Sequence, residues 1–201
     1  MSGATRIYVE VGGKRAFASA ADWPGWSRGG KDEQGALDVL SAYAPRYAKV
    51  MKLARIDFPK DATGFQVVER AKGNASTDYG VPAIPAKEEA RTTAKEMERL
   101  ITLMEAAWKY LDQVRVRVPE ELRKGPRGGG RDRDKMYAHV LDAELAYASA
   151  LRLKLKEPDR KALIAGLRDP NPEAKWPPAY AIRRIAWHAL DHAWEMEDRI
   201  P

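Results

Sequence analysis

The sequence predicts an α+β protein, in which an antiparallel four-helix bundle follows a small N-terminal part made of a β-hairpin, a sheet and a helix. Three observations predict this fold. Apolar residues alternate at a period of two near the N-terminus, they recur at the helical period in several later segments, and a proline-rich stretch separates the two regions. We therefore expect a small α+β domain over residues 1–85 and the helix bundle over residues 86–201.

Composition limits the class of protein. The chain has 201 residues, 44% of them apolar, and it contains no cysteine, which excludes disulfides, thiolate nucleophiles and cysteine-bound zinc. No apolar run approaches the length of a membrane span and no leader pattern opens the chain, so we expect a cytoplasmic protein without a membrane partner. The net charge of +6 is modest and the basic segment lacks interleaved aromatic residues, so we expect no nucleic-acid partner.

Residues 6–30 are predicted to form β structure. Ile7, Val9 and Val11 alternate with Tyr8 and Glu10 at a period of two, which is typical of a strand. A glycine-rich turn signal at residues 12–14 separates this strand from a second one, and a Pro-Gly break then leads to a short third strand.

A helix and a further strand are predicted next. Residues 32–54 have apolar residues at helical spacing, with Asp32 as the cap at the start and Pro45 as an interruption, because proline lacks an amide hydrogen. Residues 65–70 are a strand candidate. Residues 79–85 are proline-rich and extended, and they end the N-terminal part.

The second half of the chain is predicted to be helical. Residues 115–133 are expected to form a loop, because several arginines surround a run of glycines there; the alternative is a lid that attracts anions. Short connections between the helices favour an antiparallel bundle. The predicted helices are residues 86–114, 132–157, 159–167 and 183–199.

The three histidines of the chain carry the predicted site. His188 and His192 are four residues apart, so on a helix they stand one above the other, which suits two imidazoles that share a metal ion. The alternative is a solvated charged stripe along the helix. His139 shares its predicted face with small apolar residues, which is typical of an inward face. It is therefore either a core histidine with a hydrogen-bond partner or a third metal ligand.

Two segments resemble a known superfamily. HVLDAELAY around His139 and WHALDHAWEMEDR around His188 and His192 are similar to the DinB/YfiT-like pattern over about residues 86–201. That resemblance implies a four-helix bundle in which His139, His188 and His192 bind a divalent metal. In the N-terminal part, the hairpin, the segment DWPGWSRGG and the helix that follows resemble the small HicB-like unit.

Three neutral imidazoles can hold a divalent ion and leave positions open for water or substrate. Zn, Ni and Fe(II) all accept imidazole ligands, so the ligand set is compatible with each of them. Glu144 and Glu195 are the carboxylates that we predict to be catalytic, either as a base or by orienting a ligating histidine. The alternative for each is an ordinary ion pair with a neighbouring arginine.

The resemblance implies a metal-dependent transferase or hydrolase that acts on a small molecule. Any thiol in such a reaction has to be a low-molecular-weight cosubstrate, because the chain has no cysteine. The alternative is a non-catalytic binding or interaction protein with a structural metal or none. A closed shell of four ligands would favour that alternative, and an open position would favour the enzyme. The prediction allows a homodimer.

Overall fold

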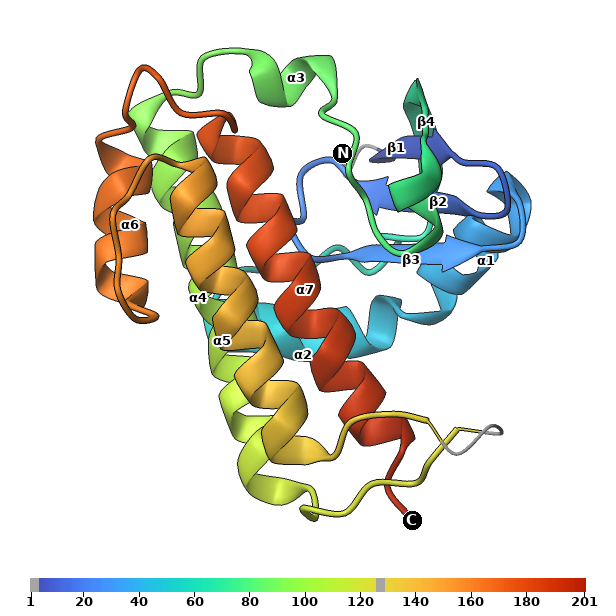
Figure 1. Ribbon diagram of the computed structural model, residues 1–201. Coiled ribbons are helices and arrows are strands. Elements are labelled where there is room, and N and C mark those ends of the chain that lie inside the picture. Colours follow the sequence, from blue (N-terminus) through green and yellow to red (C-terminus); the bar gives the residue numbers. More distant parts are fainter. Residues whose placement is uncertain (1–3, 126–128) are drawn as a thin grey trace.

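The computed structural model describes residues 4–125 and 129–201. A four-stranded sheet lies on one side of three long helices, α4, α5 and α7, and helix α2 crosses behind them in the view of Figure 1. The elements are β1 (Thr5–Val11), β2 (Ala16–Ala20), β3 (Ser27–Gly30), α1 (Glu33–Ala42), α2 (Ala44–Ala54), β4 (Phe65–Lys72), the 3-10 helix η1 (Ala75–Asp78), α3 (Ala86–Glu89), α4 (Ala94–Arg117), α5 (Arg133–Ala150), α6 (Arg160–Arg168) and α7 (Pro178–Asp198).

The sheet is mixed, with the strand order β3-β2-β1-β4. Strands β1, β2 and β3 form an antiparallel meander in which Val9 lies opposite Ala18. Strand β4 pairs in parallel with the other edge of β1. A parallel neighbour needs a long crossover connection, and helices α1 and α2 provide it. The N-terminal hairpin, sheet and helix thus agree with the prediction from sequence.

The predicted helix over residues 32–54 is divided into two. The side chain of Asp32 accepts a hydrogen bond from the amide of Gly35 (2.8 Å) and begins α1. The chain leaves the helix at Tyr43, and Pro45 then lies in the first turn of α2, where the missing amide hydrogen costs no helical hydrogen bond.

The prediction of an antiparallel four-helix bundle is wrong. Helix α6 has only nine residues and buries only Leu163 and Leu167, which is too small an apolar face for a fourth bundle helix. Helix α4 packs instead against α7 and against α2, which comes from the N-terminal part. The remaining side of α7 is covered from the sheet, since the ring of Phe17 on β2 lies 6.1 Å from that of Trp187. A helix that is apolar nearly all round needs such cover on every side.

The helix boundaries also differ from those predicted. The segment 86–114 is two helices, because Thr93 is extended and its side chain caps α4 at the amide of Glu96. Helix α5 ends at Ala150, and the chain then turns through Arg152 in the left-handed region. Residues 126–128 of the predicted basic loop lie outside the described residues, so the proposed lid stays a prediction.

The hydrophobic core is continuous from the sheet to the long helices. It includes Ile7 of β1, Tyr47 of α2 and Trp194 of α7, each with no exposed surface. Trp26 is also fully buried, where its indole donates to the carbonyl of Leu40. The core crosses the predicted boundary at residue 85, and the division into separately folding domains stays a prediction. Within the described residues, no helix has the length and apolar character of a membrane span.

Replacement of Gly30 by alanine is expected to lower the free energy of unfolding by about 3 kcal/mol. A Cβ atom at Gly30 would meet the backbone of Gly35 and Ala36, because the end of β3 lies directly against the start of α1. Because the clashing atoms belong to the backbone, rotation of a side chain cannot relieve the clash. Gly13 is the matched control, because a Cβ there meets no atom within 4 Å. Urea unfolding of both variants measures the difference, and equal stability would contradict this close approach.

Candidate metal centre

Helix α7 places His188 and His192 in the interior of the protein. Their rings lie one helical turn apart, with 4.6 Å between the ring centroids and 3.1 Å between the two Nε2 atoms. His188 is 8% exposed, and the side chain of His192 is 12% exposed. The two histidines of this polar stripe are therefore largely covered by neighbouring elements, whereas the side chains of Asp191 and Glu195 on the same stripe are 32% and 39% exposed.

His139 reaches the same point from α5, which packs against α7. Its ring centroid lies 5.1 Å from those of both His188 and His192. One ligand atom from each of the three residues lies within 4.8 Å of the other two. The structure thus brings together all three histidines that the sequence predicts as metal ligands.

The face of α5 that carries His139 is less buried than predicted. The buried row of this helix runs through Met136, Val140 and Ala148, whereas His139 is only partly buried and Ala146 is exposed. His139 lies at the border between this row and solvent. From there it turns toward α7, so it can contact a group held between the two helices.

The spacing of the ring nitrogens fits a metal ion. Ligand nitrogens about 2.0–2.1 Å from a tetrahedral ion stand about 3.4 Å apart. The Nε2 atoms of His188 and His192 are slightly closer than this, at 3.1 Å, and no pair in the cluster of ligand atoms exceeds 4.8 Å. Small side-chain rotations would bring all three nitrogens to coordinating distance.

Two of the histidines are held in the neutral form that a metal ligand requires. Burial, together with the nearby rings of His192 and His139, lowers the pKa of His188 to about 2. Burial also lowers the pKa of His139, with a smaller effect from Arg131. At neutral pH both rings are uncharged, and each has a nitrogen lone pair available to a cation.

Glu195 contacts His192. Its Oε2 atom lies 3.0 Å from Nδ1 of His192, one turn earlier on α7, and its Oε1 atom accepts a hydrogen bond from Arg199 (2.8 Å). The hydrogen bond with His192 lowers the pKa of Glu195, so the carboxylate is charged. A proton on Nδ1 leaves the Nε2 lone pair directed toward His188. This contact is the one that an orienting carboxylate would make, and both the orienting role and a role as base stay predictions.

Glu144 lies outside the histidine cluster. It is 1% exposed on the buried row of α5, and its carboxylate accepts hydrogen bonds from Arg160 (3.1 Å), which also bonds to Asp112 (3.0 Å). Burial raises the pKa of Glu144, and Arg160 opposes that shift. This arrangement is the ion pair that was the alternative to a catalytic role. Its ligand atoms are not grouped with those of His139, and its catalytic role stays a prediction.

A polar pocket of about 360 Å³ lies on the sheet side of α7, next to Glu195. Glu195 and Trp187 line it, together with Arg28 of β3 and Asp78 of η1, but the histidines themselves do not. Arg28 pairs with Asp191 at 2.6 Å. Sequence reasoning missed this pocket because Arg28 and Asp191 are 163 positions apart, and no local pattern links them.

Tyr147 is a second neighbour that the sequence analysis did not identify. Its ring on α5 lies 6.0 Å from that of His188, and the guanidinium of Arg184 lies 5.9 Å from the Tyr147 ring. The eight-residue spacing from His139 on one helix could have indicated that Tyr147 lies near the same face.

Comparison with protein-family models, with curated proteins and with solved structures finds no match, so the likeness to the DinB/YfiT-like and HicB-like families stays a prediction.

Proposed function

We propose that His139, His188 and His192 bind one divalent metal ion, and that the protein is a metal-dependent enzyme acting on a small molecule by thiol transfer or hydrolysis. The observation that carries this proposal is the meeting of all three histidines, with ligand atoms within 4.8 Å of one another. His139 comes from one helix and His188 and His192 from another, so a charged stripe along a single helix does not explain why the three lie together.

The residues of the chain prepare this site in distinct ways. His188 and His139 present neutral rings, and Glu195 holds the ring of His192 through Nδ1. A divalent ion in such a site supplies a Lewis acid and lowers the pKa of a bound water or thiol. Zn, Ni and Fe(II) are all compatible with three imidazoles.

An open coordination position favours catalysis over a structural metal. Among the described residues, the group of potential ligands has three members, and the carboxylate of Glu195 is engaged with His192 and Arg199. A closed structural site normally has four protein ligands. Three histidines therefore leave room for a water molecule or a substrate.

The pocket beside Glu195 is a suitable place for the substrate. Arginine and carboxylate side chains line it, and the pair of Arg28 and Asp191 is 18% and 32% exposed, so these groups suit a small polar molecule that carries both charges, such as an amino-acid-like thiol. The chain has no cysteine, so a thiol would be a cosubstrate. Membership of the DinB/YfiT-like class and a cytoplasmic location belong to the same proposal and rest on the sequence pattern.

Metal loading of the purified protein tests the proposal. We expect about one Zn, Ni or Fe(II) per chain by elemental mass spectrometry, and a rise in melting temperature when the preferred metal is added to chelator-treated protein. Turnover of cysteine or glutathione with 1-chloro-2,4-dinitrobenzene, or of ester substrates, should then depend on that metal. Bound metal without turnover would favour a structural role for the metal. A protein that binds none of the three metals would exclude both a catalytic and a structural metal.

Removal of the Glu195 carboxylate is expected to weaken metal binding by about 10- to 100-fold. In Glu195→Ala, nothing fixes the Nδ1 proton of His192, so Nε2 is no longer held as the free acceptor. Isothermal titration with the preferred metal measures the change. Glu197→Ala is the matched control on the same helix, because Glu197 bonds to Tyr110 and not to a histidine. Equal metal affinities of the two variants would show that Glu195 does not contribute to the metal site.

A further inference from the structure

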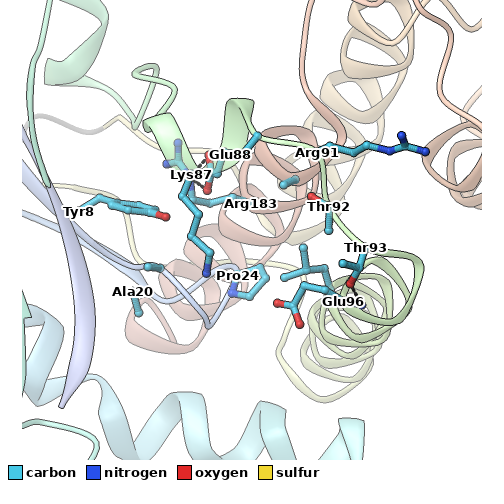
Figure 2. A pocket seen from close by; sticks show the side chains of 14 residues that line it. Tyr8, Ala20, Pro24, Lys87, Glu88, Arg91, Thr92, Thr93, Glu96 and Arg183 are labelled. Carbon is cyan, nitrogen blue, oxygen red and sulfur yellow. Dashed lines mark hydrogen bonds and ion pairs between the residues drawn. The ribbon is translucent and has the colours of Figure 1, made fainter. Parts of the chain in front are cut away.

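A second pocket lies at the other end of α7, between the sheet and the segment that leads into α4. It has a volume of about 220 Å³, and none of the three histidines lines it. Figure 2 shows side chains from four parts of the chain converging on it. Its wall includes Tyr8 of β1, Ala20 of β2, Pro24, Glu88 of α3, Thr93 before α4 and Arg183 of α7.

The hydroxyl group of Tyr8 is the unsatisfied polar group of this wall. Tyr8 is 6% exposed, and its oxygen is buried without a hydrogen-bond partner in the described part of the chain. Figure 2 shows the ring extending from β1 with the hydroxyl at the side of the pocket. A buried hydroxyl without a partner is costly, and a ligand that bonds to it would remove that cost.

The charged groups of the wall already have partners of opposite sign. Glu88 accepts hydrogen bonds from Arg183 (2.8 and 3.0 Å), and both side chains are almost fully buried. The ammonium group of Lys87 lies 2.7 Å from Asp22. An ionic ligand would have to compete with these pairs, so the pocket favours an uncharged one.

Two further charged residues at the rim support this conclusion. Glu96 faces Arg99 at 3.3 Å on the same helix. Arg91 lines the pocket with its backbone end, and Figure 2 shows its guanidinium directed away from the cavity. The remaining wall consists of the small or compact apolar residues Ala20, Ala21, Pro24, Ala90, Leu100 and Ala179, together with Thr92 and Thr93.

We propose that this pocket binds a small, uncharged and mostly apolar molecule whose hydrogen-bond acceptor receives the proton of the Tyr8 hydroxyl. The volume is below the usual range of about 300–1,000 Å³ for drug-sized ligands, which implies a ligand of on the order of ten non-hydrogen atoms. Burial, aided by the charge of Glu88, raises the pKa of Tyr8. The phenol therefore stays protonated and acts as a donor.

Titration of the full chain with acetophenone and with ethylbenzene, followed by amide NMR, tests the proposal. The two probes have similar size, but only acetophenone has an acceptor. We expect both to shift amides around Tyr8, Thr93 and Arg183, and acetophenone to bind about three- to tenfold more tightly. Benzoate is the charged counterpart and should bind more weakly than acetophenone. Tighter binding of benzoate, or no shifts at these residues with either neutral probe, would overturn the proposal.

Two variants distinguish the contribution of the Tyr8 hydroxyl to binding from that of the cavity. Tyr8→Phe should remove the preference for acetophenone over ethylbenzene, while the variant melts at the same or a higher temperature, because it loses an unpaired buried hydroxyl. Ala179→Leu should fill the space and weaken both probes at least tenfold. A preference that persists in Tyr8→Phe would exclude the hydroxyl as the recognition group, even if the leucine variant fails to fold.

Discussion

His188→Ala is expected to reduce the metal content of the purified protein from about one ion per chain to nearly none. His188 is the most buried of the three histidines, and its Nε2 atom lies 3.1 Å from that of His192. Its removal leaves two histidines on different helices. Because two imidazoles hold a divalent ion far more weakly than three, we expect a loss of at least about 100-fold in affinity.

Elemental analysis and thermal melting with added metal measure this loss. The wild type should gain stability from the metal, by about 2.7 kcal/mol at a free concentration 100 times the dissociation constant, and the variant should gain at most about 0.4 kcal/mol. Asp191→Asn is the matched control, because Asp191 lies between the two histidines but pairs with Arg28. A variant without His188 that still binds one ion per chain with wild-type affinity would exclude the three-histidine centre.

Arg183→Met is expected to lower the free energy of unfolding by about 3–5 kcal/mol. Arg183 donates to both carboxylate oxygens of Glu88 and to the carbonyl of Ala83 (2.7 Å). The two charged side chains are only 5% and 8% exposed. Methionine leaves the Glu88 charge buried without a cation, and the cost of that unpaired charge exceeds the modest net value of the intact pair.

The double variant Arg183→Met with Glu88→Leu provides the control. It removes both charges, and we expect it to recover most of the stability lost in the single variant. Urea unfolding at neutral pH measures all three proteins. If the double variant is as unstable as Arg183→Met, the loss comes from packing or from the Ala83 contact rather than from the unpaired charge of Glu88.

The instability of Arg183→Met should also depend on pH. Burial raises the pKa of Glu88, and in the wild type Arg183 opposes this shift. Without the arginine, the folded variant binds a proton at a pH where the unfolded chain, with its glutamate pKa near about 4.3, does not. Folded-state proton binding increases stability as the pH falls, so the deficit should be large at neutral pH and shrink toward the usual glutamate pKa.

The sequence by itself determined the features that depend on neighbours along the chain. The period-two alternation at Ile7 and Val9 predicts the hairpin, because successive side chains of a strand face opposite ways. The four-residue spacing of His188 and His192 places their rings together on any helix, and Asp32 begins a helix through its own side chain. Each of these features depends only on residues that are close together in the chain.

The tertiary structure decided which elements lie against one another. Periodicity shows that a segment is helical but not which neighbour covers it, so it did not reveal that the sheet and α2, rather than a fourth bundle helix, complete the cover of α4 and α7. The approach of His139 to the other histidines and the pairing of Arg28 with Asp191 have the same origin. These contacts join residues far apart in the chain, and the burial of apolar surface between whole elements brings them together.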